Sequence, residues 1–496
     1  MALRIQPDVL HQTLENEMNA IKRSLAALLL IALAGPAAGK STDVEKIDVL
    51  VKKSAELDLF SGTVLVAERG KVIYASAQGM ANRDYQLPNS LDTRFNIGSI
   101  GKTLTGVAVM QLVQTGKLAL GDSLGKHLPD FPFAEKDQIT LQHLLNHSSG
   151  LGNYMEHPEY GKHLHAEQIS ELLPLIFDQP PQFAAGSRFA YSNSGMVLLG
   201  RVVEKASGLS YADYLRQRIL IPAGMQATEL AQEQDVLPHR AVGYTPVGGG
   251  RYLGNVRRIM PASADGGLRT TVGDLLKFDQ ALYDDRLLDA AHRSQMFTPS
   301  GPHPHLASGW FSADMKGHRA VGHSGGAPGV SAEFRRYIDD GLTLVVLSNY
   351  DNVATQLAER IEAVLFELPV SMPTANEAQH AIAQNLIDLD RTSAALAVFD
   401  ALAADPEPDL NALYQSARLR IVSNMEPKQA VKSLARYIEL AGPGAEPSVA
   451  AARWRQGNAY EQLGEREQAK LSYQQALKDD PQLEEAAQAL AKLAGH

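Results

Sequence analysis

The chain has 496 residues, no cysteine and a formal net charge of −10 at neutral pH. This length is too great for one ordinary domain, so two or three are expected. The absence of cysteine excludes disulfides, thiolate metal sites and a cysteine nucleophile. The negative net charge gives no electrostatic basis for binding nucleic acid.

Residues 1–39 have the composition of a signal peptide. Lys22 and Arg23 precede an apolar run over 24–34, and small residues follow, in the order of a basic region, an apolar core and a cleavage zone. The run is too short for a comfortable transmembrane helix, although an N-terminal anchor or a buried helix is an alternative. The residues before Met18 are polar and acidic, which makes Met18 a candidate for the true start. We expect an exported protein, periplasmic or extracellular, with no stable membrane span after cleavage.

The next elements are a helix and a hairpin. Apolar residues at helical spacing predict an amphipathic helix over 42–59. Two β-rich runs, 62–68 and 71–75, flank the turn Arg69-Gly70 and predict a β-hairpin.

Ser99 and Lys102 lie at the start of another predicted helix, which ends near Gly116. Residues three apart share one face of a helix, so the two side chains can touch. A serine hydroxyl becomes an effective nucleophile when a neighbouring base takes its proton. A lysine can be that base where burial and nearby cations lower its pKa. The pair alone favours the plainer interpretation, an N-cap serine beside a solvated lysine.

The middle of the chain alternates helices and polar loops. A short helix over 139–146, capped by a threonine or its neighbour, leads into a loop that begins at His147. His147 is a candidate base, but a histidine of this kind is more often structural. Tyr191 and Asn193 lie in a loop before an apolar helix over 196–206, from which their side chains can project into a cleft.

The segment after this helix combines regular and irregular stretches. A further helix is predicted over 211–219, whereas residues 229–260 have no clear period and predict an irregular excursion. Residues 264–267 form a predicted tight turn, and a helix over 271–282 follows.

Three β-rich runs come late in the α/β part of the chain, over 319–325, 331–337 and 342–348, and a closing helix follows over 353–366. Together with the two strands of the hairpin they predict one antiparallel sheet. The helices between the two groups of strands predict a second lobe. The expected architecture is α/β and two-lobed, with a cleft between the lobes, a common place for a site.

The composition changes after a proline-bounded linker at 369–373. Residues 374–496 are rich in alanine, leucine, glutamine and charge, and small and aromatic residues recur at the spacing of a 34-residue helical repeat. The pattern resembles three tetratricopeptide repeats, although a generic helical bundle is an alternative. Stacked helix pairs leave a concave face suited to a peptide or protein partner. The residues at the repeat spacing are Gly457, Tyr460, Ala469, Tyr473, Ala476 and Pro481 in the last repeat, with weaker echoes at Ala395, Phe399, Leu402 and Pro406 and at Ala430, Leu434 and Tyr437.

Three motifs in the α/β part occur in order, namely Ser99-Ile-Gly-Lys102, Tyr191-Ser-Asn193 and His323-Ser-Gly325. They resemble the three motifs of the serine β-lactamase and penicillin-binding-protein superfamily. The tyrosine form of the second motif is similar to that of class C β-lactamases, DD-peptidases and class VIII esterases. The resemblance covers about residues 42–367. It implies an α/β two-lobed β-lactamase/transpeptidase-like domain over 40–368, with an antiparallel sheet flanked by helices plus a helical lobe, followed by the all-α repeat domain.

The resemblance also implies roles for individual residues. Ser99 would attack a carbonyl and form an acyl-enzyme, and either Lys102 or Tyr191 would take its proton. Asn193 would bind the substrate and Lys102. The backbone N–H groups of Ser99 and Gly326 would form the oxyanion hole.

Two further positions bear on the substrate. His323 stands where many β-lactamases have a lysine that recognises a substrate carboxylate, and a histidine is only partly charged at neutral pH, which weakens the case for a dedicated β-lactamase. Tyr154 falls where related enzymes place a substrate-contacting side chain. The resemblance implies neither a metal nor a cofactor.

The sequence therefore predicts an exported serine hydrolase that forms a Ser99 acyl-enzyme with a small-molecule ester or a D-amino-acid peptide or amide. One alternative is β-lactamase activity. Another is a non-catalytic protein that binds peptidoglycan-like ligands while its repeats recruit partners.

Overall fold

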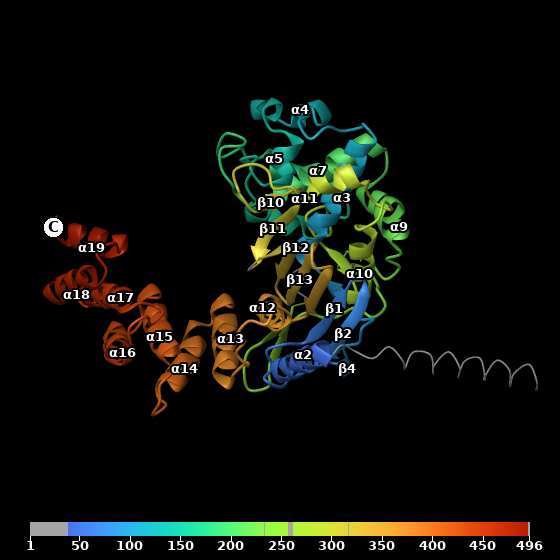
Figure 1. Cartoon of the computed structure of the whole chain (residues 1–496). Helices are drawn as coiled ribbons and strands as arrows, with labels where there is room; N and C mark the ends of the chain where they lie inside the picture. Colours follow the sequence, from blue (N-terminus) through green and yellow to red (C-terminus); the bar gives the residue numbers. More distant parts are fainter. Residues whose placement is uncertain (1–37, 233, 256–260, 316, 495–496) are drawn as a thin grey trace, which may run out of the picture. The chain divides into compact units, whose positions relative to one another are not determined.

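The computed structural model describes residues 38–232, 234–255, 261–315 and 317–494 (Figure 1). The predicted signal peptide lies outside this part of the chain apart from its last two residues, and so does Met18. Within the described ranges, no helix combines the length and the apolar character needed to cross a membrane. By their internal contacts, the described residues divide into two units between Val49 and Leu50.

A seven-stranded antiparallel sheet joins both ends of the α/β region, which runs from α2 to α12 (Figure 1). The strand after the N-terminal helix, β1, pairs with the last strand, β14, so that Gly62 lies opposite Ser348. The predicted sheet is confirmed, but the two strands at one end of it, β10 and β11, were not predicted. In spatial order the strands are β10 (Leu306–Ala307), β11 (Trp310–Met315), β12 (His318–Ala327), β13 (Val330–Tyr337), β14 (Leu342–Ser348), β1 (Gly62–Glu68) and β2 (Lys71–Gln78).

Helices cover this sheet and build the second lobe. Several short helices of the lobe have side-chain caps, and Thr140 begins α5 with a capping box, as its position predicts. The principal helices are α2 (Ala38–Glu56), α3 (Gly101–Gln114), α4 (Leu124–His127), α5 (Leu141–Leu145), α6 (Leu173–Phe177), α7 (Asn193–Ser207), α8 (Tyr211–Leu215), α9 (Ile221–Ala223), α10 (Val272–Ala281), α11 (Ala290–Phe297) and α12 (Ala354–Leu365).

Successive residues of β13 face different helices, as the two-residue period of a strand requires. Arg335 forms an ion pair with Glu362 of α12 at 2.6 Å. The next residue, Arg336, forms a buried ion pair with Asp279 of α10 at 2.5 Å. The helices α10 and α12 therefore cover opposite faces of the sheet.

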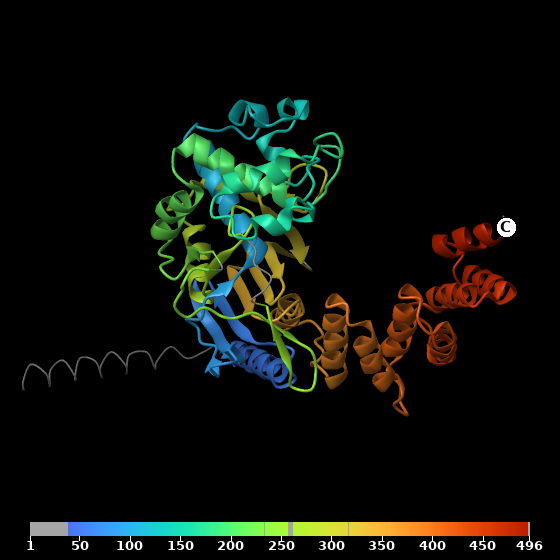
Figure 2. The same ribbon diagram turned by 180° about the vertical axis from the view of Figure 1, so that it is seen from behind.

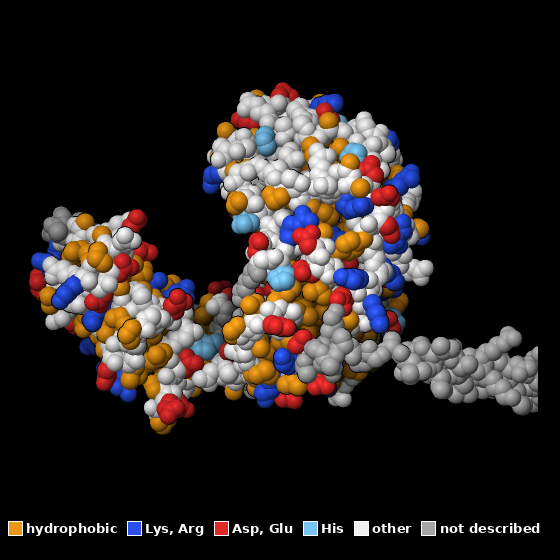
Figure 3. All heavy atoms as spheres, in the orientation of Figure 1, with side chains coloured by type: hydrophobic (Ala, Val, Ile, Leu, Met, Phe, Trp, Pro, Cys, Tyr) orange, Lys and Arg blue, Asp and Glu red, His pale blue; other side chains and the backbone are white. Residues whose placement is uncertain are grey.

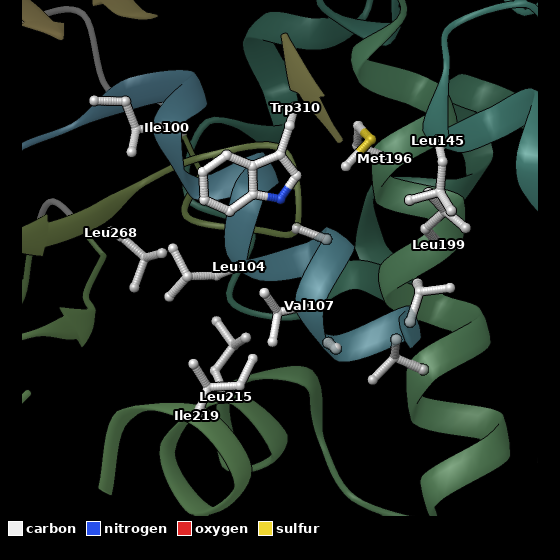
Figure 4. Close-up of a cluster of buried hydrophobic side chains, with 14 of the residues drawn as sticks. Ile100, Leu104, Val107, Leu145, Met196, Leu199, Leu215, Ile219, Leu268 and Trp310 are labelled. Atoms are coloured by element: carbon white, nitrogen blue, oxygen red, sulfur yellow. The ribbon is translucent and has the colours of Figure 1, made fainter. Parts of the chain in front are cut away.

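Helix α3 is buried almost all round, because it lies between the sheet and the helical lobe (Figure 4). Its residues Leu104 and Val107 are inaccessible to solvent. They are surrounded by apolar side chains from the sheet, the lobe and the loops between them, including Trp310, Leu268, Met196, Leu199, Leu215 and Ile219. A helix buried on every side is held rigidly by packing, which makes it a firm support for residues at its N-terminus.

The described part of the segment over 229–255 is less irregular than predicted. It contributes short strands to two small sheets, with orders β5-β9-β6 and β7-β8. These pairings tie the loop before α3 to the turn before α10. The short strands are β3 (Met80–Asn82), β4 (Leu87–Pro88), β5 (Phe95–Asn96), β6 (Glu229–Leu230), β7 (Tyr244–Pro246), β8 (Tyr252–Gly254) and β9 (Leu268–Thr270).

The C-terminal region is entirely helical in its described part, and each helix packs against the next (Figures 1 and 2). The all-α class of this region is confirmed. A Cβ atom at Gly457 of α17 would lie 2.3 Å from the Tyr473 ring of α18, so the small residue makes room for the aromatic one. The helices are α13 (Ala375–Asp388), α14 (Thr392–Ala403), α15 (Leu410–Val422), α16 (Pro427–Leu440), α17 (Val449–Gln462), α18 (Arg466–Asp479) and α19 (Glu484–Ala494).

Strand β12 touches the turn before α3 so closely that one position must be glycine. A Cβ atom at Gly325 would lie 1.9 Å from the carbonyl oxygen of Ile97 and 3.2 Å from the nitrogen of Ser99. A Cβ atom at Gly326, by contrast, would have no heavy atom within 4 Å. A methyl group can therefore be added at Gly326 without moving its neighbours, but not at Gly325.

We expect Gly325→Ala to destabilise the protein by about 1–3 kcal/mol, because backbone atoms must move to admit the methyl group. Gly326→Ala is the matched control and should leave the unfolding temperature close to that of the wild type. Thermal unfolding of the two variants measures the difference. Equal unfolding temperatures would mean that β12 and the turn before α3 are not in close contact.

Candidate active site

Ser99 and Lys102 are brought together by a single turn of helix. Ser99 lies in the 3-10 turn Gly98–Ile100 that leads into α3, and Lys102 is the second residue of α3. The Lys102 Nζ atom donates a hydrogen bond to Ser99 Oγ at 2.8 Å. Lys102 is fully buried, so the solvated lysine considered from the sequence is excluded.

A second element holds the buried lysine from the opposite side. Lys102 Nζ also donates to the carbonyl oxygen of Asp265 at 2.6 Å. One turn further along α3, Thr105 Oγ1 donates to the carbonyl oxygen of Ala264 at 2.6 Å. The turn is closed internally by a bond from Ser263 Oγ to Asp265 Oδ1 at 2.5 Å. The sequence predicted a tight turn here but gave no sign that it contacts the lysine.

Tyr191 approaches the same pair from the helical lobe. It lies in the loop before α7, and its ring centroid is 5.1 Å from Lys102 Nζ. The Tyr191 side chain is 39% exposed, so it faces the opening of the site while Lys102 lies beneath it. A tyrosine in this position can exchange a proton with a bound substrate.

His147 supports Tyr191 from behind. The two rings lie with their centroids 4.4 Å apart. His147 Nδ1 accepts a hydrogen bond from the backbone N–H of Ser192 at 3.2 Å, and the His147 carbonyl accepts one from Ala190 at 2.9 Å. Its φ of 52° lies in the left-handed region, which is uncommon for a residue other than glycine. Burial and the nearby Lys102 charge hold the pKa of His147 well below its usual value. These contacts favour the structural interpretation of His147 over that of a catalytic base.

A cavity of about 190 Å³ opens above Ser99. Four residues predicted for the site line it: Ser99, Tyr191, Asn193 and Gly326. The lining also holds residues that sequence reasoning did not assign to the site, namely Asn96, Gly98, Met155, Pro261, Asp265, Gly266, Gly267 and Ala327. Most of these lie in short turns, where no periodic pattern indicates which way a side chain points.

The geometry brings the two expected oxyanion donors to the same wall of this cavity. A Cβ atom at Gly98 would lie 2.9 Å from the Gly326 nitrogen, and one at Gly325 would lie 3.2 Å from the Ser99 nitrogen. The Ser99 and Gly326 backbones are thus adjacent across the contact between β12 and the turn before α3. Two backbone N–H groups near a nucleophilic oxygen can stabilise the negative charge that develops on a carbonyl oxygen under attack.

Two predicted contacts are wrong in detail. Tyr154 does not face the substrate cavity, since it is fully buried and donates from its hydroxyl to Asp265 Oδ2 at 3.1 Å. The neighbouring Met155 lines the cavity instead. Asn193 faces the cavity, but its amide donates to Asn153 Oδ1 at 3.3 Å, and the carbonyl that Lys102 contacts is that of Asp265.

His323 lies beside the cavity rather than in its lining. It is buried, with its ring centroid 6.4 Å from that of Tyr191 and 5.1 Å from that of Phe311. Burial and the Lys102 charge lower the pKa of His323 to about 3. The imidazole is therefore neutral at neutral pH, and not partly charged as its ordinary pKa predicts. A neutral, buried ring is poorly suited to recognise a substrate carboxylate.

The site brings together the Ser99 hydroxyl, the buried Lys102 amine, the exposed Tyr191 phenol and two adjacent backbone N–H groups. Among the described residues, no cluster of three or more histidine, aspartate or glutamate side chains could hold a metal ion. The arrangement can carry out acyl transfer through a serine ester.

The comparisons with known proteins agree with this geometry. A protein-family model described as Beta-lactamase matches residues 47–367. Penicillin-binding protein 4* of Bacillus subtilis is 32% identical over 361 residues, which are 67% of this chain and 78% of that protein. A penicillin binding protein from Bacillus halodurans is 29% identical, with 64% of this chain and 98% of that chain covered and a TM-score of 0.59. A D-stereospecific amidohydrolase from Streptomyces sp. is 25% identical, with 68% of this chain and 100% of that chain covered and a TM-score of 0.57.

The fold is that of the β-lactamase and transpeptidase-like superfamily, whose members are serine hydrolases, and the predicted fold class is confirmed. The chain belongs to the beta-lactamase family. Its relatives include penicillin-binding proteins and a D-stereospecific amidohydrolase.

His147 is expected to act through Tyr191, and a double-mutant cycle can detect this. His147→Asn tolerates the positive φ but removes the ring that supports the phenol, so kcat/KM should fall about tenfold or more through misplacement of Tyr191. In a Tyr191→Phe background the same substitution should cause little further loss. Equal losses in the two backgrounds, at unchanged unfolding temperature, would contradict a role through Tyr191.

The depressed pKa of His323 makes folding stability depend on pH. The folded state resists protonation of this ring while the unfolded state takes up a proton near pH 6.5, so its contribution is present above that pH and is lost as the pH falls towards 3. Between pH 6.5 and 5 the loss amounts to about 2 kcal/mol. His323→Asn should therefore lose less stability than the wild type over this interval, as measured by unfolding at both pH values. His165→Asn, at an exposed position, is the control. Identical pH dependence in wild type and His323→Asn would show that His323 is not held neutral.

Proposed function

We propose that this protein hydrolyses an ester or a D-amino-acid amide or peptide through an acyl-enzyme on Ser99. The observation that supports this most directly is the 2.8 Å hydrogen bond between Lys102 Nζ and Ser99 Oγ at the floor of a cavity. A buried amine in contact with a serine hydroxyl, on a helix that is itself immobilised by packing, is a preorganised nucleophile and base.

The reaction proceeds in two halves. Ser99 Oγ attacks the carbonyl carbon while its proton passes to Lys102 or to Tyr191, and the oxyanion forms against the N–H groups of Ser99 and Gly326. Tyr191 returns a proton to the leaving alcohol or amine, and the C–O or C–N bond breaks. Water then attacks the Ser99 ester with Tyr191 or Lys102 as base, releasing the acid and restoring the hydroxyl.

The surroundings of His323 favour a substrate whose leaving group is uncharged over one whose leaving group carries a carboxylate. A cation at this position would recognise a penicillin or a C-terminal D-alanine, but the imidazole is buried and its pKa is about 3. The similarity to a D-stereospecific amidohydrolase also supports amide substrates. β-Lactamase activity is the second candidate, supported by the family itself.

Residues 40–368 are proposed to be the catalytic domain, joined by a linker over 369–373 to tetratricopeptide-like repeats over 374–496. A peptide or protein partner is proposed for the repeats, because stacked helices offer a continuous surface.

On the face drawn in Figure 3, lysine and arginine side chains lie among acidic and apolar ones and form no single basic patch. We also propose that the protein is exported to the periplasm or the extracellular space. The composition of residues 1–39 and the similarity to penicillin-binding proteins support this.

We expect a fluorophosphonate to add once to the wild-type protein and not to Ser99→Ala, as measured by intact-mass spectrometry. Lys102→Ala and Tyr191→Phe should react on the order of a hundredfold more slowly, since each loses a proton-transfer partner. Ser187→Ala, at an exposed serine, is the control and should react normally.

A panel of p-nitrophenyl esters, D-alanine p-nitroanilide and nitrocefin then separates the candidate activities. Turnover of the ester or the anilide supports the proposal, and preferential turnover of nitrocefin supports a β-lactamase. An adduct that persists in Ser99→Ala would contradict the assignment of the nucleophile.

A further inference from the structure

A second cavity, of about 330 Å³, adjoins the catalytic one. Gly326 and Ala327 of β12 line both cavities. The far wall of the second cavity comes from the C-terminal end of α13, through Asn385, Asp388 and Leu389. Only the short segment Gly326-Ala327 is common to both linings, so a cavity bordered by the first helix of the C-terminal region lies next to the one above Ser99.

The direction of β12 indicates which part of a substrate would enter this space. His323 lies beside Tyr191, the group proposed to protonate the leaving atom. Ala327 is four residues further along the same strand, or about 13 Å away at the usual rise. With the leaving group at the Tyr191 end and the carbonyl oxygen at Gly326, the acyl part of the substrate extends towards Ala327 and α13.

The walls of the second cavity are tied together by hydrogen bonds. Asp351 accepts bonds from Thr245 Oγ1 and from the backbone N–H of Gly329, both at 2.6 Å. Asn385 of α13 is buried and donates to the carbonyl of Pro246 at 2.9 Å. These bonds fix the turn after β12 and the C-terminal part of α13 against the same short strand, β7.

The charged side chains among the described residues that line this cavity are both acidic. Asp351 and Asp388 line it, and none of the described residues of its lining carries a positive charge. Burial, with a smaller contribution from the charge of Asp388, raises the pKa of Asp351. The end of α13 adds the partial negative charge of a helix C-terminus. A cationic group would be favoured here over an apolar or anionic one.

We propose that this second cavity is the acyl-side subsite and that it selects acyl groups carrying an ammonium several bonds from the scissile carbonyl. This inference rests on the proposed Ser99 hydrolysis. Through Asp388, this subsite gives the C-terminal region a part in substrate selection. A short ester would not reach α13.

The test compares two acyl donors of equal length, the p-nitrophenyl esters of 6-aminohexanoate and of heptanoate, in the full-length protein. The ratio of their kcat/KM values should fall about threefold in Asp388→Asn and about tenfold in Asp388→Lys, the range expected for a charge pair near the surface. Because Asp388 is exposed and ends a helix, where a cation is preferred, neither change should unfold α13. Hydrolysis of p-nitrophenyl acetate should be unchanged in both variants.

Asp405→Lys, at an exposed position between α14 and α15, is the matched charge control and should leave the ratio unchanged. A ratio unaffected by Asp388→Lys, or acetate hydrolysis falling in parallel with that of the longer esters, would overturn the proposed subsite. Failure of the proposed function is a different result, in which no ester shows turnover that is lost in Ser99→Ala, and that result would overturn the subsite with it.

Discussion

The burial of the Lys102 side chain is the constraint on which the rest of the site depends. A buried amine is costly unless polar groups surround it, and here Ser99 Oγ and the Asp265 carbonyl accept its hydrogen bonds. The serine can then be neither displaced nor rotated without leaving the lysine unsatisfied. The positions of Ser99 and Lys102 are thereby fixed by the cost of burying the lysine.

This requirement explains features that lie far apart in the sequence. The turn at Asp265 must reach α3, and Thr105 and Tyr154 hold it there through its backbone and its carboxylate. Burial of His147 and His323, together with the nearby lysine, lowers the pKa of both imidazoles. Both rings beside Tyr191 are therefore neutral at neutral pH.

Local spacing made part of this arrangement predictable. Ser99 and Lys102 are one helical turn apart, so their contact follows from the sequence once the helix is correct. Tyr191 was found through its motif rather than through any periodicity. Asp265 was missed because its backbone carbonyl, which any residue type carries, makes the contact with the lysine.

Other errors have equally physical causes. Tyr154 and Met155 are adjacent in a 3-10 turn, where neighbouring side chains point in different directions. The predicted residue, Tyr154, is therefore buried, whereas the next residue, Met155, lines the cavity. Strand β11 has the sequence Trp-Phe-Ser-Ala-Asp-Met, which is short and mixed in polarity, so the sequence alone does not predict a strand. Its pairing with β12 stabilises the extended conformation. The position of α13 beside β7 depends on long-range packing that no local pattern encodes.

The central claim is that Ser99 Oγ, Lys102 Nζ and the Gly326 N–H converge on one reacting carbonyl. A crystal structure of the full-length protein after reaction with a fluorophosphonate tests this most directly, because the tetrahedral phosphorus imitates the intermediate. We expect a bond from phosphorus to Ser99 Oγ, with one phosphonyl oxygen between the N–H groups of Ser99 and Gly326 and Lys102 still in contact with Ser99. Phosphorus bound to another residue, or a phosphonyl oxygen directed away from Gly326, would contradict it.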